Sequence, residues 1–116
     1  MKVGVWNVRG MNGGIKQHEV VSFFQQNKLD IMGINESRIR RGNFCAVSRR
    51  RFSGFQIIHN YSDHPNGRLW AIWRRGDIQV QLLNSGSQWL HLQVVEDACS
   101  FLITFVYGLN DCNTPI

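Results

Sequence analysis

One carboxylate in this sequence is placed where it could support metal chemistry. Glu36 follows four consecutive apolar or small residues, Ile31 to Ile34, with Asp30 before them and polar residues after them. A short uninterrupted apolar run is typical of a strand that is buried on both faces. Because open α/β sheets commonly bind ligands at the carboxyl ends of their strands, Glu36 is a candidate metal ligand. A solvated carboxylate at a strand end is the alternative interpretation.

A side-chain amide follows a second run of the same kind. Val3 to Trp6 is short and apolar, and Asn7 comes directly after it. Between the two runs, Gly13-Gly14 precedes apolar residues at helical spacing, which predicts an amphipathic helix of roughly three turns. A strand, helix and strand of this length usually place the two strands parallel and adjacent. We therefore expect Asn7 and Glu36 at the same edge of one sheet.

A basic segment follows Glu36. The chain carries a formal net charge of +5, and six of its 13 lysine and arginine residues lie in this one acid-free stretch. They are Arg38, Arg40, Arg41, Arg49, Arg50 and Arg51. Such a segment attracts a polyanion, and nucleic acid is the commonest one. A solvated loop is the alternative, because basic runs are often only soluble surface.

Composition indicates one soluble globular domain. The chain has 116 residues, of which 43% are hydrophobic and 18% charged, which argues against disorder. No apolar run reaches membrane-spanning length, and polar residues interrupt the first apolar segment too early for a signal peptide. The three cysteines, Cys45, Cys99 and Cys112, lack metal-type spacing and predict neither a disulfide framework nor a zinc site. We expect an intracellular protein without a membrane partner, with the nucleus among the compartments left open.

The remaining segments predict mostly strands. A helical turn is expected at Ser48 to Phe52, and apolar runs at Phe55 to His59 and at Arg68 to Trp73 predict two strands. Apolar residues then alternate with polar ones in two segments, which predicts two half-buried strands that pair antiparallel around a turn at Asn84 to Ser87. The alternating apolar residues are Ile78, Val80 and Leu82 in the first segment and Leu90, Leu92 and Val94 in the second.

The last apolar run differs from these two. Phe101 to Tyr107 is almost wholly apolar, so we expect it in the middle of a sheet that is covered on both faces. Asn110 lies just beyond it. The sequence contains no internal repeat or linker and predicts a single α+β unit.

Four blocks of this sequence together resemble the endonuclease/exonuclease/phosphatase superfamily. The similarity is greatest to the endonuclease domain of plant LINE-type, non-LTR retrotransposons. Each block alone is a weak signal, but four in the right order are specific. The blocks are Val5 to Gly10, Asp30 to Ser37, Asn66 to Trp70 and Phe105 to Asp111.

The resemblance implies a fold and a reaction. Members of this superfamily form a four-layer αββα sandwich, as in deoxyribonuclease I, and residues 1–116 would be about its N-terminal half. Members hydrolyse phosphodiester or phosphomonoester bonds with a divalent cation, usually Mg²⁺. A phosphatase or other esterase of the same superfamily is a less favoured alternative to the endonuclease.

Site roles follow from the resemblance position by position. Glu36 resembles the metal-binding glutamate, and Asn7 resembles the amide that positions the metal-site water or phosphate. Tyr107 resembles the tyrosine that contacts the scissile phosphate, with Asn110 nearby. The residue types suit this chemistry, because Mg²⁺ takes hard oxygen ligands and is commonly held by one or two carboxylates plus the substrate phosphate. The parent domain would take DNA as its substrate.

Two motifs of the superfamily have no counterpart downstream of Tyr107. These are the Asp-x-Asn motif, which supplies the water-activating aspartate, and the closing Ser-Asp-His motif. Ser62-Asp63-His64 has the right letters but precedes the Arg68 to Trp73 strand, where members carry a variable loop. Loss of a general base typically lowers a rate by a factor of about 10² to 10⁴.

The sequence therefore predicts a truncated endonuclease domain that is inactive alone and exposes sheet surface through which it could associate. The alternative is a catalytically silent fragment that binds nucleic acid or a partner through Arg38 to Arg51. Magnesium-dependent cleavage would require Glu36, whereas simple binding to nucleic acid would not.

Overall fold

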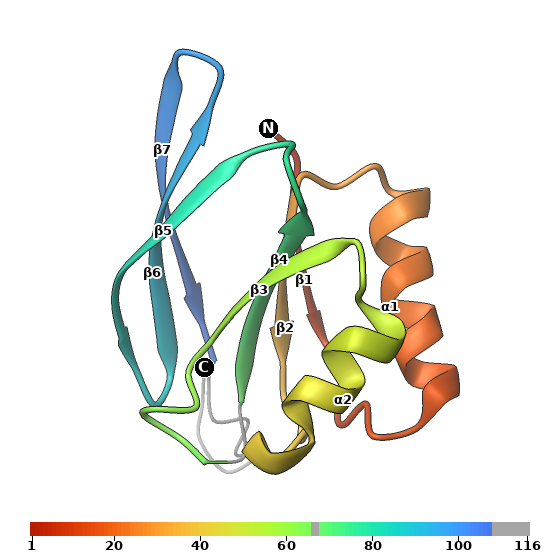
Figure 1. The fold of residues 1–116 in the computed structure, drawn as a ribbon. Helices are drawn as coiled ribbons and strands as arrows, with labels where there is room; N and C mark the ends of the chain where they lie inside the picture. The colour runs from red at the N-terminus through yellow and green to blue at the C-terminus, as the bar shows by residue number, and fades with distance from the viewer. Residues whose placement is uncertain (66–67, 108–116) are drawn as a thin grey trace, which may run out of the picture.

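A computed structural model describes residues 1–65 and 68–107 of the chain, and Figure 1 shows its ribbon. The described residues form nine elements in the order strand, helix, strand, helix and then five strands. They are β1 (Val3–Asn7), α1 (Gly14–Gln26), β2 (Ile31–Asn35), α2 (Arg41–Arg51), β3 (Phe55–His59), β4 (Leu69–Arg74), β5 (Gln79–Gly86), β6 (Trp89–Glu96) and β7 (Cys99–Val106).

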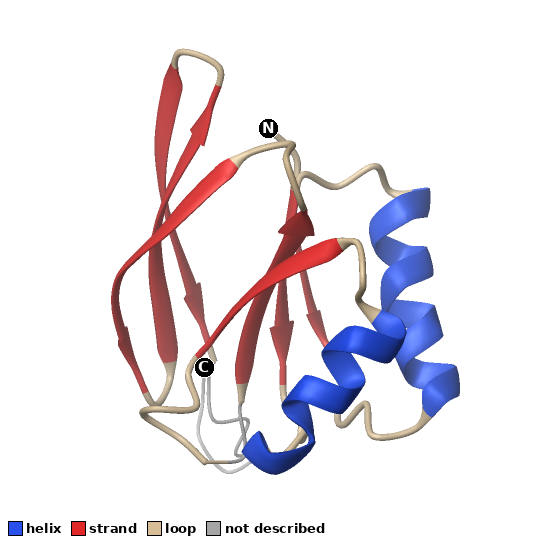
Figure 2. Ribbon diagram, in the orientation of Figure 1, coloured by secondary structure: helices blue, strands red, loops and turns tan. Residues whose placement is uncertain are grey.

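The strands form two sheets that face each other. Sheet A has the strand order β1-β2-β4-β3, and sheet B has the order β5-β6-β7. The pair β1 and β2 is parallel, and the other neighbours are antiparallel. Both helices cover the face of sheet A that points away from sheet B (Figure 2). The described residues thus form three layers, helices, sheet A and sheet B, of an α+β fold. Neither helix is long and apolar enough to cross a membrane.

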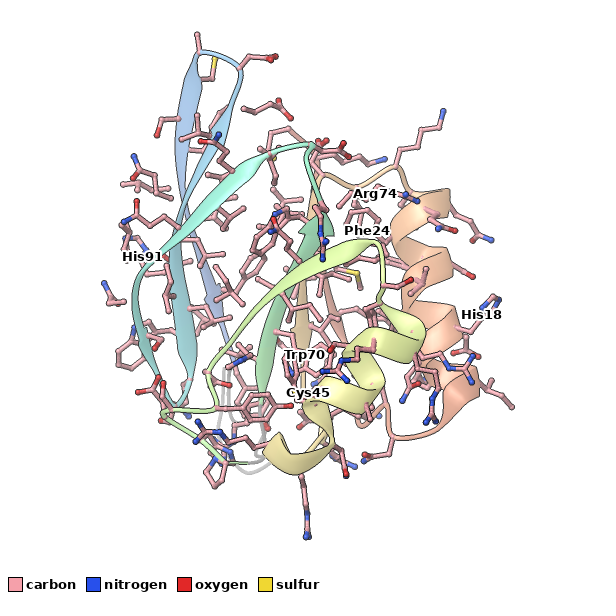
Figure 3. The ribbon with its side chains drawn as sticks, in the orientation of Figure 1. His18, Phe24, Cys45, Trp70, Arg74 and His91 are labelled. Atoms are coloured by element: carbon pink, nitrogen blue, oxygen red, sulfur yellow. The ribbon has the colours of Figure 1, made fainter. Side chains whose placement is uncertain are left out.

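A core of aromatic and aliphatic side chains joins the helices to sheet A. Because successive side chains of a strand point to opposite faces, Met32 and Ile34 on β2 and Trp70 on β4 face the helices. Phe24 of α1 packs edge-on against Phe55 at a centroid distance of 4.9 Å. Figure 3 shows Phe24 and Trp70 in the space between the helices and this sheet. All five side chains are buried, so this core is filled within the described residues.

A second core lies between the two sheets. Ile31 and Leu69 point into it from sheet A, and Leu90, Leu92 and Phe105 point into it from sheet B. All five are buried. The strands of the two sheets face one another in order. The hydrogen bond from Asn60, just after β3, to Gly86 places β3 opposite β5, and direct contacts place β4 opposite β6. The close approach of Gly33 to Phe105 places β2 opposite β7. No described strand of sheet B lies opposite β1.

The structure confirms the predicted strand–helix–strand unit. Val3 pairs with Ile31 and Asn7 with Asn35 in parallel register, and α1 begins at Gly14. The predicted strand Phe55–His59 is confirmed, and the strand predicted at Arg68 to Trp73 is β4, Leu69–Arg74. The two alternating strands pair antiparallel as expected, with Leu90, Leu92 and Val94 buried.

Three local predictions were incomplete or wrong. The helical turn predicted at Ser48 to Phe52 is confirmed as far as Arg51 but is the end of a longer helix, α2, whose arginine-rich sequence lacks an apolar stripe. The turn predicted at Asn84 to Ser87 is mostly strand, because β5 contains an irregularity between Leu82 and Asn84 and continues to Gly86. Leu82 pairs with the buried Leu92 but is itself 39% exposed, so the alternation indicated its face correctly but not its burial.

The third of these predictions placed Phe101 to Tyr107 in the middle of a sheet that is covered on both faces. Within the described residues β7 is an edge strand of sheet B rather than a central one. Phe105 is buried against sheet A, but Leu102 and Val106 on the opposite face are exposed. The continuous apolar pattern correctly indicates two apolar faces, but described residues cover only one of them.

Candidate functional site

Glu36 stands at the carboxyl end of β2 in an unusual backbone conformation. Its φ is +56°, in the left-handed region that residues other than glycine rarely adopt. Two backbone hydrogen bonds hold it there: Glu36 N–H donates to the carbonyl of Arg68 at 2.7 Å, and Gly10 N–H donates to the carbonyl of Glu36 at 2.7 Å. Glu36 is therefore fixed from both sides, by the loop after β1 and by the segment before β4.

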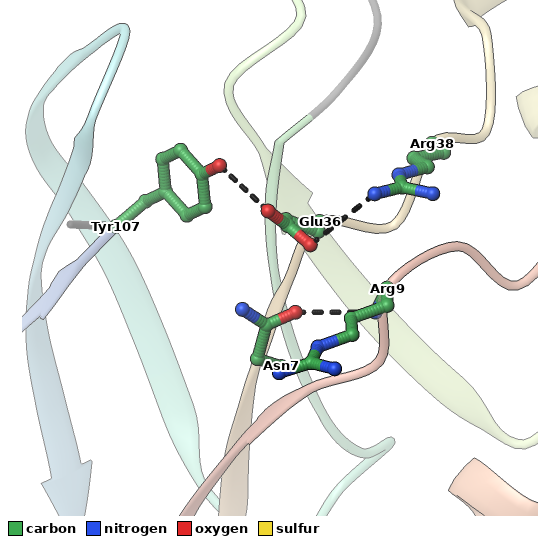
Figure 4. Close-up of polar contacts among 5 residues, drawn as sticks. All are labelled: Asn7, Arg9, Glu36, Arg38 and Tyr107. Atoms are coloured by element: carbon green, nitrogen blue, oxygen red, sulfur yellow. Dashed lines mark hydrogen bonds and ion pairs between the residues drawn. The ribbon is translucent and has the colours of Figure 1, made fainter. Parts of the chain in front are cut away.

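Two side chains contact the Glu36 carboxylate. The Tyr107 hydroxyl donates a hydrogen bond of 2.7 Å to Oε1, and Arg38 Nη2 lies 3.6 Å from Oε2 (Figure 4). Only 19% of the Glu36 side chain is exposed. Tyr107 follows β7 of sheet B, whereas Glu36 follows β2 of sheet A. The site is thus built where the two sheets end together.

Tyr107 is held as a neutral phenol. Its hydrogen bond to Glu36, its burial and the negative charge of Glu36 together raise the pKa of the Tyr107 hydroxyl. The Arg68 guanidinium lies over the Tyr107 ring, 5.2 Å from its centroid, and acts in the opposite direction. Tyr107 therefore presents a hydrogen-bond donor at the site at neutral pH.

Two asparagines end the parallel strand pair beside Glu36. Asn7 Oδ1 accepts a hydrogen bond of 3.1 Å from the backbone N–H of Arg9, which fixes its amide. Asn35 is the register partner of Asn7. Its Oδ1 is buried and has no hydrogen-bond partner among the described residues. Such an orphan acceptor is unusual, because buried polar atoms are nearly always paired.

Asn35 was missed in the sequence prediction. A signal was available, because two-residue alternation from Ile31 puts Asn35 on the inter-sheet face of β2, one position before Glu36. Arg68 was also missed as a site residue, because it lies outside the strand core and outside the basic segment.

Three of the five described non-glycine residues with positive φ lie in the loops of this site, and the other two, Lys28 and Asp97, lie elsewhere. Arg9, Glu36 and Arg38 all have φ between +53° and +56°. Each such non-glycine residue costs on the order of 1 kcal/mol or more and persists only where the surroundings impose it. Backbone strain of this kind clusters at functional sites, which supports a functional role for these loops.

A cavity of about 250 Å³ opens at the site. It is lined by Glu36, Arg38, His64, Arg68 and Tyr107. Burial and, to a lesser degree, the Arg68 charge lower the pKa of His64. The turn that carries Ser62-Asp63-His64 therefore reaches the site through His64. The Asp63 carboxylate accepts a hydrogen bond of 2.6 Å from the Ser85 hydroxyl instead.

A larger cavity lies elsewhere and lacks acids. It measures about 590 Å³, lies between α2 and β3, and has Arg49, Phe52 and Arg75 among its lining residues but no carboxylate. The smaller cavity at Glu36 holds the only convergent set of acid, base and hydroxyl side chains among those that line the two cavities.

The structure divides the basic segment predicted to bind nucleic acid. Arg38 lies at the cavity and pairs with Glu36, whereas Arg40 precedes α2 and the other four lie on it. The four on the helix are Arg41, Arg49, Arg50 and Arg51. Over the described residues, Arg38 is the one member of the segment within ion-pair distance of a carboxylate. The other five arginines make α2 and its start basic, and they do not line the cavity at Glu36.

The donor set at Glu36 could hold one hard cation, in a site completed by other ligands. Within residues 1–65 and 68–107, no three His, Cys, Asp or Glu side chains cluster as metal ligands. Glu36 offers a carboxylate at the cavity, whereas the unpaired Asn35 oxygen is buried and Asn35 is not among the residues that line the cavity. Mg²⁺ is commonly bound by one or two carboxylates with waters and substrate phosphate, so Glu36 fits one such ligand position. Asn110 lies outside the described residues, as does most of its block from Gly108 onward.

Comparison with known proteins gives structural matches only. No model of a protein family matches the sequence, and no curated protein matches it. The fold is similar to that of the endonuclease domain of TRAS1, a telomere-specific non-LTR retrotransposon, with a TM-score of 0.68 and 11% sequence identity. It is also similar to the human Nocturnin catalytic domain, solved with a bound sulfate anion, with a TM-score of 0.53 and 12% identity.

Both matches cover most of this chain but only part of the other. The TRAS1 match covers 96% of this chain and 46% of the TRAS1 chain, and the Nocturnin match covers 86% and 48%. This chain therefore spans about half the length of these solved structures. The three described layers are a partial αββα sandwich, as the sequence predicted.

Proposed function

We propose that this chain carries the metal-binding half of a DNase I-like phosphodiesterase site of the retrotransposon endonuclease type and is inactive alone. One observation carries the proposal. The Glu36 carboxylate is fixed at the carboxyl end of β2, in a left-handed backbone conformation, and receives a hydrogen bond from Tyr107 of the opposite sheet. Such an arrangement has little value for packing, because it keeps an acid at a cavity mouth.

Each side chain has a role in this proposal. Glu36 would supply an oxygen ligand for Mg²⁺, which when bound offsets negative charge on a phosphate. The Asn7 amide would donate a hydrogen bond to a phosphate oxygen. The Tyr107 hydroxyl, whose single proton now goes to Glu36, would do the same once that hydrogen bond is released. Arg38 balances the Glu36 charge and becomes available to the phosphate when a cation takes its place.

A general base for water is the missing component. No described carboxylate other than Glu36 lines the cavity. His64 lines it, and its lowered pKa keeps the imidazole neutral at pH 7. His64 is consequently the group to test for any residual hydrolysis, whereas Glu36 is already committed to the cation.

Nicking of supercoiled plasmid tests this proposal. The purified chain is incubated with plasmid in Mg²⁺ or in EDTA, and Mg²⁺ binding is measured in parallel by calorimetry. We expect no nicking above background. We also expect weak Mg²⁺ binding, which Glu36→Gln should abolish. Glu19→Gln, on the exposed face of α1, is the control and should leave this binding unchanged.

Two results would change the conclusion. Mg²⁺-dependent nicking by the unmodified chain that disappears in Glu36→Gln would refute inactivity. If His64→Ala, made separately, also abolished that nicking, His64 would be identified as the base. Absence of Mg²⁺ binding by a folded chain would refute the metal role of Glu36.

A second candidate function is nucleic-acid binding without catalysis. It is favoured by α2, which carries Arg41, Arg49, Arg50 and Arg51 with no acid in the helix. Binding of this kind weakens steeply with salt because phosphate contacts release counterions. We expect a triple Arg49, Arg50 and Arg51→Gln variant to lower DNA affinity and reduce the salt slope.

The chain offers a matched control for that variant. Lys2, Lys16 and Lys28 are its three lysines, and their replacement by Gln removes the same charge from other elements. Equal loss of affinity in both triple variants would show that only net charge matters and would refute a binding role for α2.

A further inference from the structure

The free edge of β7 has the features of an acceptor for another strand. Tyr107 N–H donates to the carbonyl of Gln88 before β6 at 2.8 Å, so alternate residues of β7 direct their N–H groups toward β6. The N–H groups of Leu102, Thr104 and Val106 point the other way, where no described strand pairs with them.

This edge also lacks the usual protection. Native proteins commonly shield exposed edge strands with charges, prolines or bulges. Residues 98 to 107 contain no charged residue and no proline, and the register of β7 on β6 is regular throughout. Unpaired backbone on an uncharged strand favours pairing with another polypeptide.

Sheet A extends one strand beyond sheet B on the same side. Val3 and Val5 share a face of β1 with Asn7 and are the register partners of Ile31 and Gly33, which face sheet B. Val3 is 42% exposed and Val5 54% exposed, because no described strand lies opposite β1. A strand added next to β7 would lie opposite β1 and cover both valines.

The outer face of sheet B carries exposed apolar side chains among polar ones such as His91, Gln93 and Thr104, and no described helix covers it. Leu102 is 67% exposed and Val106 61% exposed on β7, and Trp89 of β6 lies on the same face. Figure 3 shows His91 on this face, turned away from the helices, which all lie over sheet A. The uncovered surface is thus continuous from the β7 edge onto this face.

A second copy of this chain does not fit the β7 edge. If the β7 strands of two copies paired to continue sheet B, the partner's β7 would occupy the position opposite β1. In each copy, however, the position opposite β7 is filled by β2. The partner's β2 would then coincide with this chain's β1, so the offset of one strand excludes this symmetric dimer.

We propose that the β7 edge and the overhanging β1 form a docking surface for the polypeptide segment that completes the DNase I-like sandwich. This segment would pair a strand with β7 and place apolar side chains over Val3 and Val5. The size of the similar domains supports this occupant, since 54% of the TRAS1 chain lies outside the part that matches (100% minus the 46% covered). The proposal concerns the surface alone and does not require Glu36 to bind a metal.

Amide hydrogen exchange of the 116-residue chain, read by NMR, tests this surface. The first probe is a lysine-flanked peptide of alternating valine and threonine, which needs only main-chain pairing. The second probe is the part of the TRAS1 domain that lies outside the match. With either probe, we expect exchange at Leu102, Thr104 and Val106 to slow by roughly tenfold or more.

Two substitutions at one position provide the control. Leu102→Pro removes an N–H that faces the free edge and leaves the bonds to β6 in place, so the chain should fold but lose the protection. Leu102→Ala keeps the N–H and should retain it.

Three outcomes would overturn the proposal. The first is that neither probe slows exchange at the three amides. The second is that Leu102→Pro leaves the protection unchanged. The third is that the amides of the chain alone are protected in proportion to its concentration, which would mean that copies of the chain pair with one another.

Discussion

Replacing Gly33 with alanine should show how tightly the site depends on the contact between the sheets. A Cβ at Gly33 would lie 2.7 Å from Cε1 and 2.9 Å from Cγ of the Phe105 ring. Phe105 is only 3% exposed, so its ring cannot turn away without opening the inter-sheet core. Overpacking of this kind typically costs about 1–3 kcal/mol. The ring must shift, and Tyr107, two residues further on, should move away from Glu36.

Two readouts distinguish this mechanism from general destabilisation. Urea unfolding followed by tryptophan fluorescence gives the loss in the free energy of unfolding. Absorbance titration then follows the chain's two tyrosines, and the raised pKa of Tyr107 should fall toward its ordinary value if its hydrogen bond to Glu36 is lost.

A double variant and a control complete the experiment. Phe105→Leu makes room for the alanine, so Gly33→Ala with Phe105→Leu should be more stable than additivity predicts by about 1 kcal/mol or more. Gly54→Ala is the control, because a Cβ there would meet no atom within 4 Å. The reasoning fails if Gly33→Ala is as neutral as Gly54→Ala, or if the double variant is simply additive.

Three further predictions concern stability and charge. Asn60→Ala should cost about 2–4 kcal/mol in urea unfolding, because the buried Asn60 amide bonds the backbone at Leu69 and Gly86 and thereby joins the two sheets; an unchanged midpoint would contradict this role. Burial raises the pKa of Tyr61 from 10.0 to about 12, so the neutral phenol stabilises the fold fully below pH 10 and this stabilisation is lost as the pH rises toward 12; Tyr61→Phe should remove that part of the alkaline unfolding profile. Arg38→Gln should strengthen Mg²⁺ binding in calorimetry about two- to tenfold, because it removes the cation that now faces Glu36; weaker binding would show that Arg38 positions the carboxylate instead.

The fold was predictable wherever one local rule decided an element. The parallel pair β1 and β2 followed from two apolar runs and the helix between them, and β6 followed from the alternation of Leu90, Leu92 and Val94. The helix α2 was not predictable in full, because its stability comes from Phe44 and Val47 packing on the core rather than from an apolar stripe. A sequence pattern shows periodicity, whereas this helix depends on how these two side chains pack in the folded chain.

The site was predictable only for the residues that end strands. Glu36, Asn7 and Tyr107 do meet at one end of the sandwich, although whether they act on phosphate stays a prediction. The roles of Arg38 and His64 at the cavity could not be deduced, because each depends on how a loop folds back after its strand. Loop geometry here is set by long-range backbone bonds such as Gly10 to Glu36, which no local pattern encodes.

The two cores of the described residues differ in how far they are closed. The core between the helices and sheet A is filled by its own residues, whereas the core between the sheets ends abruptly at β1, where Val3 and Val5 are exposed. Glu36 stands at the end of β2, one strand from that boundary, and 19% of its side chain is exposed. A strand paired with β7, as proposed above, would lie opposite β1 and would close the core between the sheets on the side where Val3 and Val5 are exposed.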